Sequence, residues 1–77
     1  MQLYINGQTA TVGMKAQTFR GEPVTLISWS EPGSRSGGNG GRVYVEEKGG
    51  IRCEYFPSVI GGKFMTEEQK MEENEAL

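Results

Sequence analysis

Few side chains in this chain could carry out catalysis or hold a metal ion. The sequence contains no histidine, no aspartate and a single cysteine, Cys53. Catalytic dyads and triads need a base beside the nucleophile, and zinc sites need several cysteine or histidine ligands. The alternation of neighbouring residues places Cys53 on a core-facing side, where a thiol acts as a small apolar group. We therefore predict no catalytic residue, no metal site, no cofactor and no enzymatic activity.

Aromatic and basic side chains are the candidates for binding. Two tyrosines fall on the outward faces of predicted strands, where such rings can contact a partner protein or stack on bases. We assign Trp29 to the core, because so small a chain needs its largest side chain inside. The glycine-rich residues 33–42 could offer backbone N–H groups and two arginines to a phosphate, although they lack the Gly-Lys-Ser/Thr ending of nucleotide-binding loops. The candidate binding residues are Tyr4, Arg35, Asn39, Arg42 and Tyr44.

Charge is divided unevenly along the chain. The net charge is −2. Residues 1–65 hold seven basic against five acidic side chains, a net of +2, whereas residues 66–77 hold one against five, a net of −4. A surplus of two charges is far below the basic footprint of a dedicated nucleic-acid binder. The acidic end is typical of a solubilising tail, or of a segment that binds a basic surface.

The size of the chain limits its organisation. With 77 residues, of which 35% are apolar, we expect one small domain over residues 1–65 and an acidic tail over residues 66–77. No run reaches the roughly 18 apolar residues of a membrane span. The first residues also lack the basic stretch and apolar block of a signal peptide. We expect a cytoplasmic protein without membrane contact.

The first element that the sequence predicts is a β-hairpin. Asn6-Gly7 suits a type I′ turn, and it lies between short alternating segments at residues 2–5 and 8–12. The expected core face pairs Ile5 with Gln8, Leu3 with Ala10 and Met1 with Val12; the opposite face pairs Tyr4 with Thr9 and Gln2 with Thr11.

The middle of the chain predicts a central strand between two less regular segments. Residues 14–19 are expected to form an edge strand or an extended loop. Residues 24–30 are the most strand-like run, and the adjacent Leu26 and Ile27 indicate either burial on both faces or a β-bulge. Residues 31–41 contain no apolar anchor, so we expect a long, mobile loop there.

A second hairpin is predicted over residues 42–47 and 51–56. A three-residue Lys48-Gly49-Gly50 loop keeps charged side chains off the core face, whereas a two-residue loop would place Glu54 opposite a valine. The expected pairs are Val45 with Cys53, Val43 with Tyr55 and Glu47 with Ile51 on one face, and Glu46 with Arg52 and Tyr44 with Glu54 on the other.

The last segments are short. Pro57 and the following glycines favour a 3₁₀ turn, and residues 63–65 are expected to return as a last strand. Thr66 and Gln69 have the spacing of a capping box, which favours a helix from Glu67 onward. Because the tail has no apolar stripe, we expect that helix to be frayed, or the tail to be disordered.

Five or six short strands and no core helix predict a mainly β fold, a small closed or nearly closed antiparallel barrel that hides its edges. A glycine-turned hairpin followed by Tyr55-Phe56-Pro57-Ser58-Val59 resembles the end of SH3-type barrels over residues 43–60. The resemblance implies an SH3-like architecture and carries over no binding residue. The short chain, tight hairpins and acidic tail also resemble small accessory proteins of phages and prophages.

The leading functional hypothesis is a non-catalytic protein-binding module, for example a phage-encoded factor that inhibits or redirects a host protein. One alternative is a nucleic-acid-binding barrel, which needs the two tyrosines and the arginines on one face. Another is an oligomer that binds a small phosphorylated ligand through the glycine-rich loop. A homodimer through an exposed strand edge, such as residues 14–19, is compatible with all three.

Overall fold

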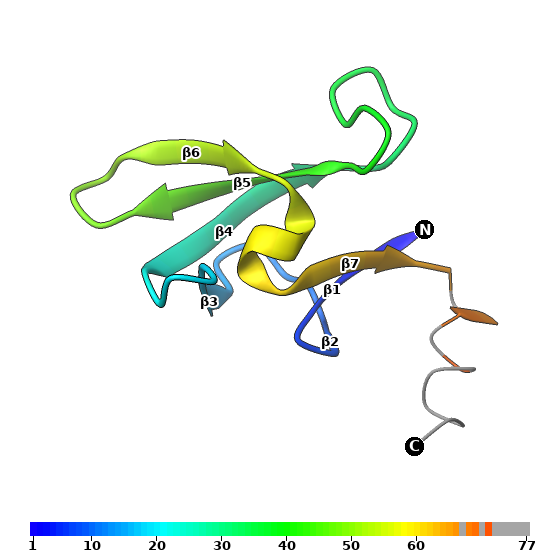
Figure 1. Ribbon diagram of the computed structural model, residues 1–77, viewed down its shortest axis with the longest axis horizontal. Helices are drawn as coiled ribbons and strands as arrows, with labels where there is room; N and C mark the ends of the chain where they lie inside the picture. Colours follow the sequence, from blue (N-terminus) through cyan, green and yellow to red (C-terminus); the bar gives the residue numbers. More distant parts are fainter. Residues whose placement is uncertain (67, 70, 72–77) are drawn as a thin grey trace.

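The protein is a small, mainly β domain built from two antiparallel sheets (Figure 1). The computed structural model describes residues 1–66, 68, 69 and 71. The strand order is β2-β1-β7 in the three-stranded sheet and β3-β4-β5-β6 in the four-stranded sheet. The elements are β1 (Gln2–Ile5), β2 (Gln8–Thr9), β3 (Lys15–Gln17), β4 (Pro23–Ser30), β5 (Arg42–Glu47), β6 (Arg52–Tyr55), the 3₁₀ helix η1 (Pro57–Ile60) and β7 (Gly62–Met65).

The strands do not close into a barrel, so that part of the prediction is wrong. After β6, Pro57 starts η1, and the chain then pairs β7 with β1 instead of continuing along the four-stranded sheet. At the other end, β2 has only two residues, too few to form a ladder with β3. Within the described residues, each sheet therefore keeps two edge strands, β2 and β7 in one and β3 and β6 in the other.

The first hairpin has the predicted turn and register. Asn6 and Gly7 both have positive φ, 50° and 84°, as a type I′ turn requires. The paired residues are Tyr4 with Thr9 and Ile5 with Gln8, and the Ala10 N–H donates to the Leu3 carbonyl at 2.9 Å.

The predicted core face of this hairpin is only partly correct, since Gln8, which was expected on it beside the turn, is exposed. Met1 and Val12 are 60% and 72% exposed, contrary to expectation. The ladder ends at Thr9, and the chain then turns away. The three residues of this face that are buried are Leu3, Ile5 and Ala10.

Strand β4 is the central strand that the sequence predicted. It lies between β3 and β5. Strand β3 is an edge strand, which was one of the two predictions for residues 14–19. The register with β5 shifts between Leu26 and Ser28, which confirms a β-bulge at Ile27. The bulge lets Leu26 be fully buried while Ile27 stays half-buried.

The second hairpin has the predicted three-residue loop. The Glu47 N–H donates to the Ile51 carbonyl at 2.6 Å, and Gly49 and Gly50 have φ of 86° and 79°. Only glycine adopts such angles without strain. The paired residues are Val43 with Tyr55, Tyr44 with Glu54, Val45 with Cys53 and Glu46 with Arg52.

The end of the domain also follows the sequence. The 3₁₀ helix and the last strand are both present. Thr66 and Gln69 form the capping box, with backbone-to-side-chain distances of 2.8 and 3.2 Å. The expected helix from Glu67 onward, and the alternative of a disordered tail, fall largely outside the described residues.

The core lies between the two sheets and under η1. Trp29 is half-buried against this core, so it is less enclosed than the sequence suggested. The buried core residues are Leu3, Ile5, Ala10, Val24, Leu26, Val43, Val45 and Ile60.

Candidate functional site

The two tyrosines predicted to bind lie on different sheets. Tyr4 belongs to β1 of the three-stranded sheet, and Tyr44 belongs to β5 of the four-stranded sheet. Both are half-buried. The Tyr44 hydroxyl lies 3.1 Å from the Ser30 hydroxyl, so its polar end has a partner within the sheet. The two rings therefore do not form one aromatic platform on a single sheet.

Arg42 is used within the fold. One terminal nitrogen of its guanidinium donates to the carbonyls of Gly41 at 2.8 Å and Gly37 at 3.2 Å. Its Nε lies 3.4 Å from a Glu54 carboxylate oxygen, and its guanidinium carbon lies 4.2 Å from the centre of the Phe56 ring. Arg42 thus joins the 31–41 loop to β6, and it is half-buried instead of presented to a ligand.

The glycine-rich loop is internally hydrogen-bonded, whereas the sequence indicated a mobile connector. The Gly33 N–H donates to the Gly38 carbonyl at 2.7 Å, and the Ser34 hydroxyl donates to the Glu31 carbonyl at 2.6 Å. The N–H groups of Ser34, Gly37 and Gly38 also donate to oxygens of this loop. These amides are therefore not presented to a phosphate. Of the predicted loop contacts, the exposed ones are Arg35 and Asn39.

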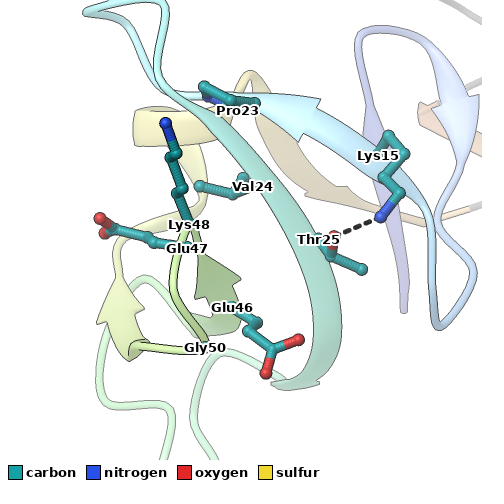
Figure 2. Close-up of a pocket in the computed structure, with 8 residues that line it drawn as sticks. All are labelled: Lys15, Pro23, Val24, Thr25, Glu46, Glu47, Lys48 and Gly50. Atoms are coloured by element: carbon teal, nitrogen blue, oxygen red, sulfur yellow. Dashed lines mark hydrogen bonds between the residues drawn. The ribbon is translucent and has the colours of Figure 1, made fainter.

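The hollow between the start of β4 and the end of β5 holds no set of side chains that point toward a common centre. It has a volume of about 440 Å³ and mixes two lysines with two glutamates. Figure 2 shows the carboxylates of Glu46 and Glu47 pointing away from one another, while Lys15 is held by its 2.7 Å hydrogen bond to Thr25. The residues that line it are Lys15, Pro23, Val24, Thr25, Glu46, Glu47, Lys48 and Gly50.

A second hollow lies where the 18–22 turn meets η1 and the end of β6. It has a volume of about 330 Å³, and its most prominent side chain is Phe19, which is 75% exposed. Most large aromatic side chains of a small domain are needed in the core, so one left this exposed beside a hollow is a candidate contact residue. We call this hollow the Phe19 groove; it is lined by Thr18, Phe19, Arg20, Glu22, Tyr55 and Val59.

The backbone fixes the 18–22 turn and so fixes the position of Phe19. The Phe19 N–H donates to the Val59 carbonyl of η1 at 2.9 Å. Buried Thr18 closes the turn, because its N–H donates to the Glu22 carbonyl at 2.9 Å and its hydroxyl accepts from the Glu22 N–H at 3.2 Å. The Arg20 guanidinium lies 5.5 Å from the centre of the Phe19 ring. The exposed ring of Phe19 is thus attached to a backbone whose position is fixed by hydrogen bonds.

Tyr55 connects the Phe19 groove to an acidic group on β5. Its hydroxyl donates to the Glu47 carboxylate. This hydrogen bond, with a smaller contribution from Cys53, lowers the pKa of the Glu47 carboxyl below its ordinary value of 4.5. The same carboxylate, followed by partial burial, raises the pKa of Tyr55 and the pKa of the Cys53 thiol. Cys53 is therefore held as a neutral thiol, which is a poor nucleophile.

The Glu47–Tyr55 hydrogen bond predicts a pH dependence of stability. Because the pKa of Glu47 is depressed in the folded state, its contribution is present above the ordinary value of 4.5 and is lost as the pH falls through the folded-state value. We expect the wild type to lose more free energy of unfolding than Tyr55→Phe between neutral pH and about pH 3. Urea titrations of both proteins across this range measure the difference; parallel curves would contradict the assignment.

Comparison with known proteins finds no relative of this chain. No family model, no curated protein and no solved structure matches the chain. The described residues contain no group of three or more cysteine or acidic side chains that could hold a metal ion. No helix among them has the length and apolar character needed to cross a lipid bilayer. The candidate site therefore rests on geometry alone.

None of the six residues that line the Phe19 groove is among the sequence-based candidates. Phe19 precedes the Arg20-Gly21-Glu22-Pro23 turn, and an aromatic residue beside a turn was the available signal for it. Tyr55 and Val59 lie in the segment that resembles SH3-type barrels. The contact between the 18–22 turn and η1 is a tertiary contact, which no local sequence pattern predicts.

Proposed function

We propose that this chain is a non-catalytic protein-binding module, and that the Phe19 groove receives an apolar side chain of a partner protein. The observation that carries the proposal is the exposure of Phe19, 75%, on a turn whose backbone is fixed by hydrogen bonds. A rigid aromatic side chain loses little conformational entropy on binding, which is why such residues dominate the energetics of protein interfaces. Tyr55 and Val59 supply the walls against which a partner side chain packs.

The chemistry of the groove favours a protein partner over a nucleic acid. Its lining holds one cation, Arg20, and one anion, Glu22, so it offers no surplus of positive charge to a phosphate backbone. Nucleic-acid affinity comes largely from several lysine or arginine contacts to phosphates. Arg42, which the nucleic-acid hypothesis needs, is engaged with Glu54 and the 31–41 loop.

Two narrower proposals rest on resemblance. The order of elements over residues 43–60 supports a relationship to SH3-type domains, and the size and acidic tail support a phage-encoded, cytoplasmic factor that acts on a host protein. Both would be strengthened by the identity of the partner.

The test compares three tagged proteins: the wild type, Phe19→Ser and Val12→Ser. Val12 is 72% exposed and does not line the groove, so its variant controls for the loss of an exposed apolar side chain. Each is used to capture proteins from nuclease-treated cell lysate, followed by quantitative mass spectrometry. The captured partner is then purified and its Kd measured by calorimetry with all three proteins.

We expect Phe19→Ser to weaken the Kd about 30-fold, the effect of losing a hot-spot aromatic residue, and Val12→Ser to leave it unchanged. Circular dichroism should show both variants folded. Equal binding by all three proteins would refute the groove as the site. In a parallel capture from lysate without nuclease, recovery of nucleic acid and no protein partner would favour the nucleic-acid alternative.

A further inference from the structure

Strand β6 leaves one side of its backbone unpaired. It is an edge strand, and in Figure 1 no other described element runs along its outer side. The Glu47–Ile51 hydrogen bond fixes the alternation along the hairpin, so Cys53 and Tyr55 bond to β5. The backbone N–H and C=O groups of Arg52 and Glu54 therefore point outward, toward solvent.

The sequence of β6 is complementary to itself when read antiparallel. A two-fold axis through Cys53 places Arg52 opposite Glu54 of a second copy, and Glu54 opposite Arg52 of that copy. These are the residues with outward backbone groups, so each pair exchanges two backbone hydrogen bonds. Opposite charges directly across strands stabilise pairing. We propose that β6 pairs with β6 of a second copy in this register, which makes the four-stranded sheet continuous across a homodimer.

The other face of β6 fits the same register. Cys53 lies opposite Cys53 of the second copy, and Ile51 lies opposite Tyr55 of that copy. Ile51 is 61% exposed in the single chain, and Tyr55 is half-buried, so the pairing covers an apolar side chain that the fold leaves in solvent. An aromatic ring beside a β-branched residue is a favourable cross-strand pair.

Charge also supports this pairing. Arg52 is exposed and makes no ion pair with any described residue. Glu54 is 54% exposed, and its one recorded ionic contact in the described chain, with Arg42, uses a single carboxylate oxygen at 3.4 Å. Its second oxygen is thus available to an arginine from another chain. A charged residue usually protects an edge strand from self-association, but alternating signs turn this protection into complementarity.

The remaining edges of the described sheets lack this property. Strand β2 has two residues and β3 has three, too few for a stable ladder. Self-pairing of β7 would bring Lys63 together with uncharged residues and supply no opposite charge. The sequence suggested residues 14–19 as a dimer edge; the pattern of β6 makes it the stronger candidate.

The test uses two single variants that should fail alone and succeed together. Arg52→Glu makes both charged positions acidic, and Glu54→Arg makes both basic, so each homodimer places like charges opposite one another. In an equimolar mixture, every charged pair across the strands is again opposite in sign. Sedimentation equilibrium of the wild type, each variant and the mixture, at concentrations up to about 1 mM, gives the four association constants.

We expect wild-type association with a Kd of about 0.1 to 1 mM, since a short edge pairing buries little surface. Each variant alone should associate about tenfold more weakly, and the mixture should recover the wild-type value. Thermal unfolding of each variant confirms that it folds. A monomeric wild type at the highest concentration would overturn the proposal, as would a dimer whose Kd neither variant changes.

Disulfide formation between the Cys53 residues of two copies tests the proposed register directly. Opposite residues that do not exchange hydrogen bonds have Cα atoms about 4.5 Å apart, within the range that a disulfide spans. Diamide takes one proton and one electron from each of two thiols as the S–S bond forms. We expect a disulfide-linked dimer on a non-reducing gel from the wild type and from the mixture, and at least fivefold less from either variant alone. Because the raised pKa of Cys53 slows its oxidation, the reaction is run at about pH 9, and labelling by a small thiol reagent is the control for reactivity. A wild-type dimer whose Cys53 is labelled by the reagent but does not form this cross-link would exclude the proposed register. Tyr55 belongs both to this interface and to the Phe19 groove, but neither test here requires a binding partner, so the dimer can be confirmed or refuted whatever the groove binds.

Discussion

Replacing Leu26 by alanine is expected to lower the free energy of unfolding by about 2 to 5 kcal/mol. Leu26 has no exposed surface and lies on the central strand β4, opposite Val45. Its N–H is held by the Met14 carbonyl at 2.8 Å, and the Gly13 N–H donates to its carbonyl at 2.7 Å, so the backbone has little freedom to move into the space left behind. The lost side chain therefore leaves a cavity.

The effect is large relative to the whole protein. A domain of this size has a total stability of only a few kcal/mol, so we expect a substantial unfolded fraction at 25 °C. Urea denaturation followed by Trp29 fluorescence measures the change. Val12→Ala, at a position 72% exposed, is the control and should shift stability by less than about 0.5 kcal/mol. Similar losses in the two variants would mean that Leu26 is not enclosed as described.

The turns of this protein could be predicted because their causes are local. Asn6-Gly7 needs positive φ at both positions, and that need alone selects the two-residue loop and the register of the first hairpin. In the second hairpin, the requirement to keep Glu54 off the core face decided the length of the Lys48-Gly49-Gly50 loop. A shift by one residue would have moved every side chain to the wrong face.

The assembly of the strands could not be predicted in the same way. A closed barrel and the arrangement found here contain the same hairpins, and they differ in whether the edge strands of the two sheets pair with one another. That choice depends on how Pro57–Ile60 packs against the core. Met1 and Val12 fit the alternation of a core face, but β2 ends at Thr9 and both side chains are exposed.

The candidate site also combines local features that the sequence predicts with tertiary contacts that it does not. An arginine beside a glycine-rich loop has the composition of an anion site, but the contacts of Arg42 with Gly37, Glu54 and Phe56 form only when the loop folds back on β6. Phe19 lies at the end of a segment for which the sequence allowed either a strand or a loop, and its backbone is held by a hydrogen bond to Val59, forty residues later in the chain. Composition led to the prediction of a binding function, whereas the choice of candidate residues depends on tertiary contacts.

Gly41→Ala is expected to cost about 2 to 5 kcal/mol of stability, well beyond the usual effect of adding one methyl group. Gly41 is buried and has φ of 77°, a conformation that strains any residue with a Cβ. A Cβ at this position would also lie 2.5 Å from a ring carbon of Phe64 and 3.0 Å from the Ser30 carbonyl. Phe64 packs against the core, so its ring cannot move away without disturbing buried residues.

Gly49→Ala separates these two causes. Gly49 has φ of 86°, so it carries the same backbone strain, but a Cβ there would have nothing within 4 Å. We expect Gly49→Ala to cost about 1 to 2 kcal/mol, the conformational part alone, and the excess for Gly41→Ala to report the collision with Phe64. Urea denaturation gives both values. Because truncating Phe64 removes the obstacle, Gly41→Ala should cost less in a Phe64→Leu background than in the wild type. Equal costs for the two alanine variants, or no relief from Phe64→Leu, would show that Gly41 is required for its φ angle and not for the close approach of β7 to β5.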